Sequence, residues 1–318
     1  MKLIRLLKRC CQNYIRASVR KKKLAKHSGY LANLLVNFSN IRNISGGKNI
    51  AFKPNILHSL FKQNKLKVMK NLEKKVAIVT GGGSGIGRAI SLLYASEGAK
   101  IVVSDIDEKG GNETVSEIKS KGGEALFVKA DTSKPDDSKK VVEQAVKQFG
   151  GLHIAVNNAG IGGPLKPVGE YPIEGWDNVI SINLSGVFYG MRYQIPAMLT
   201  SGGGSIVNIA SILGKVAAKN SPAYVAAKHG VVGLTKAAAL EYADQKIRIN
   251  AIGPGYIVTP LLTKTLDEAT MNALAGLHPI GRLGTSEEVA ELALWLNSDK
   301  ASFVTGAYYN IDGGYLAQ

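Results

Sequence analysis

The stretch VAIVTGGGSGIGRAI, residues 76–90, decides the fold of this chain. Its first five residues are apolar or β-branched and predict a buried strand, and the residues from Gly85 onward predict a helix. Between the two, Gly81, Gly85 and Gly87 form a G-x-x-x-G-x-G pattern. Glycines at such positions let the backbone turn sharply, approach a pyrophosphate and present helix N-terminal amides to it. For the motif alone, a glycine-rich turn without a ligand is the competing interpretation.

Short apolar runs alternate with helical segments along the rest of the chain. We expect strands at 76–80, 101–105, 125–131, 152–160, 204–211, 247–255 and 307–312. We expect helices that end near 97 and 149 and helices that span about 112–120, 176–199 and 222–243. The alternation predicts an α/β fold, a Rossmann-type doubly wound parallel sheet of about seven strands with helices on both faces, in a single domain. The one long connection, 255–286, is a candidate substrate lid.

The net charge of +16 belongs to the first 68 residues, which hold 16 of the 40 Lys and Arg and none of the 24 Asp and Glu. The remainder is formally neutral, so the basic composition predicts nothing about what the core binds. We divide the chain into a basic extension, 1–68, expected to be poorly ordered, and a dinucleotide-binding domain, 69–318. Our preferred interpretation of the extension is translated sequence upstream of a true start at Met69. A targeting presequence and a basic arm for a membrane surface or nucleic acid are the alternatives.

Cysteine, histidine and apolar content set further limits. Cys10 and Cys11 both lie in the extension and cannot cross-link the core, which favours a reducing compartment such as the cytoplasm, with an organelle as the alternative. No apolar run reaches 18 residues, so no transmembrane helix is expected. The spacing of His153, His229 and His278 is not that of metal ligands, and no metal site is expected.

A carboxylate ends the second predicted strand, where Asp105 lies 18 residues after Gly87. In a dinucleotide-binding fold this position accepts hydrogen bonds from the adenosine ribose hydroxyls and repels a 2′-phosphate. The positions where a basic residue would accept that phosphate hold Ser84 and Ile106. The sequence therefore favours NAD over NADP, although Lys109 is near enough to weaken the preference. A solvated aspartate at a strand end is the competing interpretation.

The stretch SPAYVAAKHGVVG, residues 221–233, places Tyr224 and Lys228 on one face of a predicted helix. A partly buried tyrosine beside a solvated lysine is the ordinary interpretation of such a pair. The functional interpretation is a phenol whose pKa is lowered by a fixed ammonium, which makes it a proton donor and acceptor near neutral pH.

From about Met69 to Gln318 the chain resembles the short-chain dehydrogenases/reductases. The resemblance is carried by an ordered set of motifs: TGGGSGIG (80–87), Asp105, ADT (130–132), NNAG (157–160), SINLSG around Asn183, IVNIAS with Ser211, YVAAK (224–228) and PGYIVT (254–259). Each motif is weak alone, whereas the set in this order and spacing is specific.

The resemblance implies roles for the matching residues. Tyr224 would be the general acid/base, Lys228 would hold the nicotinamide ribose and lower the tyrosine pKa, and Ser211 would bind the substrate oxygen. Asn183 would hold a water that relays protons to Lys228. Besides Tyr224 and Lys228, the cofactor-binding residues it implies are Gly81, Ser84, Gly85, Ile86, Gly87, Asp105, Asp131, Thr132, Asn158, Ala159, Gly160, Pro254, Gly255, Ile257 and Thr259.

We therefore expect an oxidoreductase that transfers a hydride between NAD(H) and a secondary alcohol or ketone. The segments 161–168, 212–216 and 256–285 would surround the substrate, and their apolar character favours a small neutral molecule, cyclic or hydroxylated. The alternatives are an NADPH-dependent 3-oxoacyl carrier-protein reductase, a nucleotide-sensing protein without turnover, and a nucleic-acid or membrane binder acting through residues 1–68. The resemblance also implies a homodimer or homotetramer in which helices 176–199 and 222–243 pair across a two-fold axis.

Overall fold

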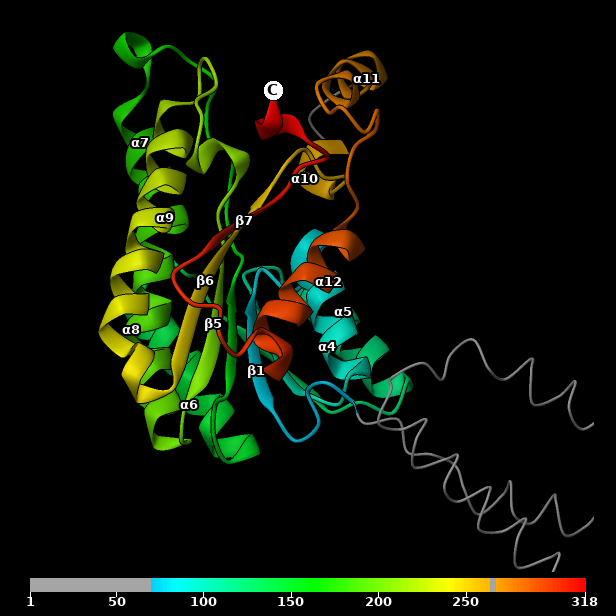
Figure 1. The fold of residues 1–318 in the computed structure, drawn as a ribbon, viewed down its shortest axis with the longest axis vertical. Coiled ribbons are helices and arrows are strands. Elements are labelled where there is room, and N and C mark those ends of the chain that lie inside the picture. The colour runs from blue at the N-terminus through cyan, green and yellow to red at the C-terminus, as the bar shows by residue number, and fades with distance from the viewer. Residues whose placement is uncertain (1–69, 264–266) are drawn as a thin grey trace, which may run out of the picture. The chain divides into compact units, whose positions relative to one another are not determined.

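A seven-stranded parallel sheet forms the centre of the molecule. The computed structural model describes residues 70–263 and 267–318, so the basic extension 1–68 lies outside the described residues. The strands are arranged in the order β3-β2-β1-β4-β5-β6-β7, and each pairs in parallel with its neighbours (Figure 1). They span β1 Val76–Thr80, β2 Lys100–Asp105, β3 Ala125–Lys129, β4 Ile154–Asn157, β5 Gly204–Ile209, β6 Ile247–Pro254 and β7 Tyr308–Ile311.

The sheet is buried on both faces because its strands are apolar at successive positions rather than at every second one. In β1, Ala77 and Val79 belong to one core cluster, and Val76 and Ile78 belong to the other. All five residues of β1 are buried. A strand that is buried on both sides needs helices on both faces of the sheet. The two core clusters are formed where these helices pack against the sheet.

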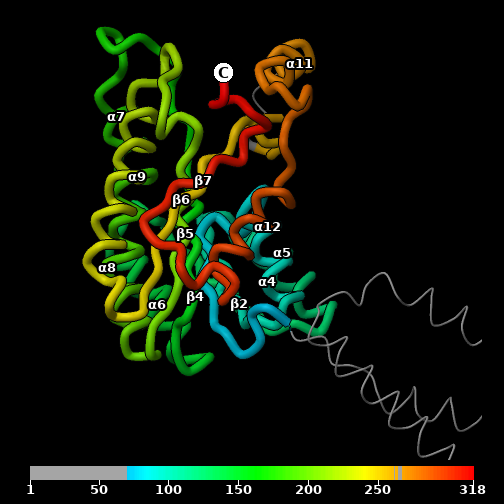
Figure 2. The backbone as a smooth tube through the Cα atoms, in the orientation of Figure 1, coloured from blue at the N-terminus to red at the C-terminus, as the bar shows by residue number. Residues whose placement is uncertain are grey.

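Helices cover the two faces as the doubly wound pattern requires (Figures 1 and 2). On one face lie α4 (Gly85–Ser96), α5 (Glu108–Ser120) and α12 (Ser286–Asn297), which contribute to the first cluster. On the other lie α6 (Pro135–Phe149), α8 (Gly186–Thr200) and α9 (Pro222–Tyr242), which contribute to the second. Within the described residues, no helix is both long enough and apolar enough to span a bilayer.

Local signals set several helix ends. Helix α6 has Pro135 in its first turn with Asp136 and Asp137, and ends at Gly150 in a left-handed conformation with φ of 86°. Proline and acidic residues suit a helix N-terminus, and glycine adopts the left-handed cap without steric cost. Helix α12 begins with a capping box between Thr285 and Glu288.

The structure modifies four of the expected segments. The helix expected at 176–199 consists of α7 (Ile173–Ile180), a π-helical turn η2 (Ser181–Ser185) and α8. The strands expected at 125–131 and 152–160 are shorter, Ala125–Lys129 and Ile154–Asn157. The segment 255–286 is not one open loop, since it contains the short helices α10 (Pro260–Thr263) and α11 (Glu268–Gly276).

Because the strands are parallel, their carboxyl ends meet at one edge of the sheet. The expected site motifs follow β1, β2, β3, β4, β5 and β6 at this edge. Figures 1 and 2 place α11, the C-terminal turn and the segment that leads into α7 at the same end of the molecule. Ligands of open α/β sheets bind at this edge.

Candidate active site

The glycine-rich loop leaves the first turn of α4 open to a ligand. Ser84 stands at the N-cap, and its side chain makes no capping hydrogen bond. Gly81 and Gly85 have φ of 64° and 50°, which a side chain would disfavour. A Cβ on Gly81 would lie 2.8 Å from Nδ2 of Asn158, so the loop approaches the end of β4 closely. Uncapped amides in a glycine-rich loop form a set of hydrogen-bond donors that fits a pyrophosphate. Ile86 and Gly87 belong to the same first turn of α4.

Asp105 is fixed at the end of β2 by the same loop. The Gly83 amide donates to its Oδ2 at 2.8 Å, and the Asp107 amide donates to its Oδ1 at 2.9 Å. Each carboxylate oxygen accepts one backbone hydrogen bond and retains a lone pair for a ribose hydroxyl. The neighbouring Ile106 is 67% exposed, so its position is open to whatever lies beyond the carboxylate.

Thr80 joins the glycine-rich loop to the end of β4, a role that the sequence analysis missed. Its Oγ1 accepts from the Asn158 amide at 2.9 Å and from the Ala159 amide at 3.1 Å. In return, Nδ2 of Asn158 donates to the carbonyls of Thr80 at 2.9 Å and Gly81 at 3.3 Å. The only sequence signal was a hydroxyl residue at the point where a buried strand gives way to glycine.

The remaining predicted cofactor-binding residues follow the ends of β3 and β6. Asp131 Oδ1 accepts from the amide and the hydroxyl of Ser133 at 3.0 and 2.7 Å, and Thr132 follows it in the turn. Pro254 ends β6, and the Gly255 amide donates to Ile311. Ile257 pairs with Gly284. A Cβ on Gly85 would lie 3.4 Å from the Thr259 side chain, which brings this turn against the glycine-rich loop.

The three reactive side chains gather where β5 and α9 meet. Lys228 is 4% exposed, and its Nζ donates to the Ile209 carbonyl at 2.8 Å. The same Nζ lies 5.4 Å from the centre of the Tyr224 ring. Ser211, two residues beyond Ile209, is 9% exposed and hydrogen-bonds the Tyr224 phenol through its side chain. The structure therefore brings together the serine, tyrosine and lysine that the sequence singled out.

Asn183 lies beside this cluster, and its amide is engaged by the backbone. Its Oδ1 accepts from the Ile161 amide at 2.9 Å, and its Nδ2 donates to the Ile161 carbonyl at 2.8 Å. A Cβ on Gly160 would contact Asn183 Oδ1 and would lie 3.7 Å from Lys228 Nζ. Within the described residues, the Asn183 side chain thus binds the backbone of the segment that follows β4.

Burial shifts both ionisable groups of the cluster toward their neutral forms. It lowers the pKa of Lys228 to about 8, because the ammonium loses its hydration. Burial also raises the pKa of Tyr224, while the hydrogen bond with Ser211 opposes that change and the nearby Tyr256 adds to it. The net effect on the Tyr224 pKa is therefore a rise, and not the lowering by Lys228 that the sequence analysis expects.

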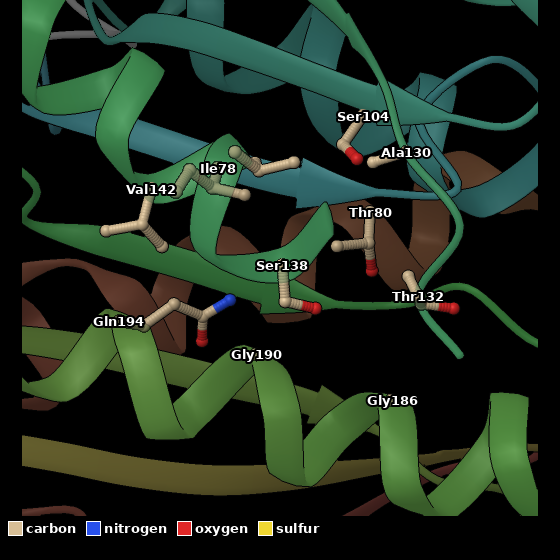
Figure 3. Close-up of a pocket in the computed structure, with 11 residues that line it drawn as sticks. Ile78, Thr80, Ser104, Ala130, Thr132, Ser138, Val142, Gly186, Gly190 and Gln194 are labelled. Carbon is tan, nitrogen blue, oxygen red and sulfur yellow. The ribbon is translucent and has the colours of Figure 1, made fainter. Parts of the chain in front are cut away.

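A separate cavity lies away from these residues, on the α6 and α8 side of the sheet (Figure 3). Thr80, Ser104, Thr132 and Gln194 face it. The Ser104 hydroxyl is buried and has no hydrogen-bond partner among the described residues. None of the three reactive side chains lines the cavity, so it is not the place where the chemistry occurs.

Comparisons with known proteins agree with this geometry. Residues 81–316 match the family model described as enoyl-(acyl carrier protein) reductase. The chain is 54% identical over 253 residues to a cyclohexanol dehydrogenase of Acinetobacter sp. (strain SE19), covering 79% of this chain and 99% of that protein. It is 44% identical over 252 residues to a 2,5-dichloro-2,5-cyclohexadiene-1,4-diol dehydrogenase of Sphingobium indicum, covering 78% and 100%.

A solved structure extends the comparison to three dimensions. The crystal structure of levodione reductase superposes with a TM-score of 0.76 at 37% identity, covering 77% of this chain and 99% of the other. The glycine-rich loop, the strands β2 to β7 and the serine, tyrosine and lysine cluster lie within the residues that match the family model. The chain belongs to the short-chain dehydrogenase/reductase family.

Proposed function

We propose that this protein catalyses the reversible, NAD-dependent oxidation of a cyclic secondary alcohol to the corresponding ketone. The observation that carries the proposal is the grouping of Ser211, Tyr224 and Lys228 at the sheet edge that also holds the open turn of α4. A proton-transferring phenol and a dinucleotide-binding turn at one edge suit hydride transfer to or from a carbon that carries oxygen.

Each reactive side chain has a distinct task in this mechanism. Ser211 binds the substrate oxygen and holds it near the phenol. Tyr224 takes the hydroxyl proton in oxidation and returns it to the carbonyl oxygen in reduction. Lys228, held by the Ile209 carbonyl, stabilises the phenolate that forms when the proton leaves. Asn183 fixes the 160–161 backbone beside Lys228, and a water relay through this region remains a prediction.

The cofactor is held by the residues of the carboxyl edge. Bound there, NAD would supply the hydride acceptor at its nicotinamide ring. The α4 turn would hold the pyrophosphate, Asp105 the adenosine ribose, and the turn from Pro254 to Thr259 the nicotinamide. The carboxylate of Asp105, together with the apolar Ile106 beside it, supports NAD rather than NADP.

We infer the substrate class from exposed apolar side chains in the segments expected to surround the substrate. Three segments present apolar side chains to their surroundings near the carboxyl edge: Leu165 and Val168 before α7, Val216 after Ser211, and Val258, Leu277 and Ile280 around α11. The Lys166 amide donates to the Asn220 carbonyl, which joins the first two segments. An apolar surrounding suits a neutral ring, and the two relatives named above act on six-membered rings.

The test is NADH formation by the full chain with cyclohexanol, alongside linear and polyhydroxy secondary alcohols, with NAD and with NADP. Tyr224→Phe should lower kcat by about 10²- to 10⁴-fold, the usual contribution of a general acid or base. Tyr309→Phe is the matched control, because Tyr309 packs against Trp295 away from the cluster.

Other outcomes favour the alternatives. Faster reduction of 3-oxoacyl carrier-protein thioesters with NADPH would favour the carrier-protein reductase. Tight NADH binding without turnover of any alcohol or ketone would favour a nucleotide sensor.

A further inference from the structure

A tyrosine from the last strand contacts the backbone of the catalytic serine. Tyr308 lies in β7, 97 residues beyond Ser211, and its Oη donates to the Ser211 carbonyl at 2.7 Å. The Gly214 amide donates to the same oxygen at 2.8 Å. Both lone pairs of that carbonyl are therefore used, and the peptide plane that follows Ser211 is held by two donors.

The neighbouring strand leaves room for this contact. Gly253 in β6 lies next to the phenol of Tyr308, and a Cβ at Gly253 would overlap Tyr308 Oη. Any other residue at 253 would therefore displace the hydroxyl from the serine carbonyl. The glycine and the tyrosine form one arrangement across the β6–β7 pair.

The carbonyl is connected to the serine hydroxyl through the backbone dihedrals of Ser211, on which the allowed side-chain rotamers depend. Ser211 is extended, with φ of −176° and ψ of 163°, and its Oγ accepts from the Leu213 amide at 3.2 Å. On the upstream side, the Ala210 amide donates to Ile252 at 2.8 Å. Upstream bonds and the Tyr308 bond together restrict the backbone on either side of Ser211, and a fixed backbone restricts the rotamers of its side chain.

The phenol is suited to act as a permanent donor. Burial, with a further contribution from Asp312, raises the pKa of Tyr308 well above its ordinary value, so the hydroxyl keeps its proton at any working pH. Lys215 Nζ lies 5.1 Å from the centre of the ring, which fixes the ring from its outer side.

We propose that Tyr308 is a positioning residue that orients the Ser211 hydroxyl toward the substrate oxygen, acting through the Ser211 carbonyl. The proposal rests on the proposed function, in which Ser211 binds that oxygen. Because the Tyr308 hydroxyl is used by the Ser211 carbonyl, we expect its removal to affect the chemical step and to leave cofactor binding unchanged.

The first readout is kinetic. Tyr308→Phe should lower kcat for the alcohol by about tenfold, the scale of one well-placed hydrogen bond, while the KM for NAD stays as in the wild type. Gly253→Ala should reproduce the loss, and Tyr309→Phe on the opposite face of the strand should not. In a Ser211→Ala background, Tyr308→Phe should have no further effect, because the group it orients is gone. An equal loss with and without Ser211 would overturn the proposal.

The second readout does not depend on turnover. Crystal structures of the wild type and of Tyr309→Phe should show one Ser211 rotamer, and that of Tyr308→Phe should show a displaced or divided Oγ. An unchanged Oγ in Tyr308→Phe would refute the inference even if the protein oxidises alcohols. A displaced Oγ in a protein that oxidises no alcohol would support the inference while contradicting the proposed function.

Discussion

The ammonium of Lys228 lies where burial favours its neutral form. Its pKa is lowered to about 8, whereas that of Tyr224 is raised above its ordinary value. Ketone reduction needs a protonated phenol and a charged lysine. As the pH rises, the lysine is therefore the first of the two to lose the required proton.

This order of titration predicts a pH profile. We expect kcat/KM for ketone reduction to be flat near neutrality and to fall above about pH 8, approaching tenfold per pH unit, as Lys228 loses its charge. In Lys228→Arg, whose guanidinium stays charged, the fall should move to higher pH. NADH binding measured by fluorescence controls for damage to the site. A wild-type profile that stays flat to pH 10 would contradict the assignment.

A second residue-scale prediction concerns the cofactor. Changing Asp105→Ser together with Ile106→Arg removes the acceptor for the ribose and supplies a cation for a 2′-phosphate. The ratio of kcat/KM with NAD to that with NADP should fall by about a hundredfold, the scale of lost charged hydrogen bonds.

Asp105→Asn separates charge from anchoring at the same position. Its side-chain carbonyl can still accept from the Gly83 amide, but its charge is gone. If this variant keeps the full preference for NAD, then Asp105 acts by holding the loop rather than by repelling the phosphate.

At the scale of elements, one histidine connects α11 to the turn that follows β6. His278 is 3% exposed. Its Nε2 accepts from the Tyr256 amide at 3.2 Å, and its Nδ1 lies 2.9 Å from the Leu274 carbonyl in α11. Its ring also packs against Tyr315 in the C-terminal turn, with the ring centres 5.6 Å apart. Helix α11, the turn after β6 and the C-terminal turn are thus joined at a single side chain.

Removing that connection should loosen the segment rather than unfold the protein. We expect His278→Ala to raise the KM for NAD several-fold with a smaller change in kcat, and to speed hydrogen exchange across 255–284. His278→Gln keeps an acceptor for Tyr256 and should restore part of the affinity. Exchange that remains at the wild-type rate in His278→Ala would show that the segment is held by other contacts.

The elements also show which features are readable from sequence. The seven strands were predictable because buried parallel strands appear as short, continuous apolar runs, as in VAIVT. Most of the predicted cofactor-binding residues could be proposed from sequence because they follow strands that end at one edge, and Tyr224 and Lys228 because they lie four residues apart on a helix. By contrast, the π-helical turn at Asn183 and helix α11 depend on tertiary packing that propensity does not encode. The contact from Tyr308 to Ser211 joins residues 97 apart, and no local pattern signals it.

At the scale of the whole molecule, a histidine at the opposite end of the sheet allows a prediction of how the stability of the fold changes in acid. His153 precedes β4, and its Nδ1 accepts from the Val76 amide at 3.1 Å. Burial, with a smaller effect of Lys75, lowers the pKa of His153 below its ordinary value. The unfolded chain therefore binds this proton first as the pH falls, so the stabilisation present above about pH 6.5 is lost below it.

The measurement is the unfolding temperature as a function of pH. Between about pH 7 and 5 the wild type should lose more stability than His153→Gln, which has no proton to gain in this range. Activity at pH 7.5 should be equal in the two proteins, because His153 lies away from the carboxyl edge. Parallel curves would mean that other groups account for the acid response.

The outer faces of the helices around α8 and α9 bear on assembly. Phe188 and Leu199 are 47% and 37% exposed on α8, and Leu240 is 84% exposed on α9. Gly233, which is also on α9, is exposed, and a Cβ added there would have no atom within 4 Å. Large apolar side chains beside small residues suit the close approach of a second pair of helices, as the predicted two-fold pairing requires.

We therefore predict that Phe188→Asp combined with Leu240→Asp lowers the mass measured by light scattering after size-exclusion chromatography. Each copy would bury two new carboxylates in the interface. These carboxylates would have no cationic partner there and would repel those of the other copy. Phe303→Asp is the control, since Phe303 is 102% exposed and lies in neither helix. If Phe303→Asp dissociates the protein and the helix variant does not, the copies meet on the face near β7 rather than through α8 and α9.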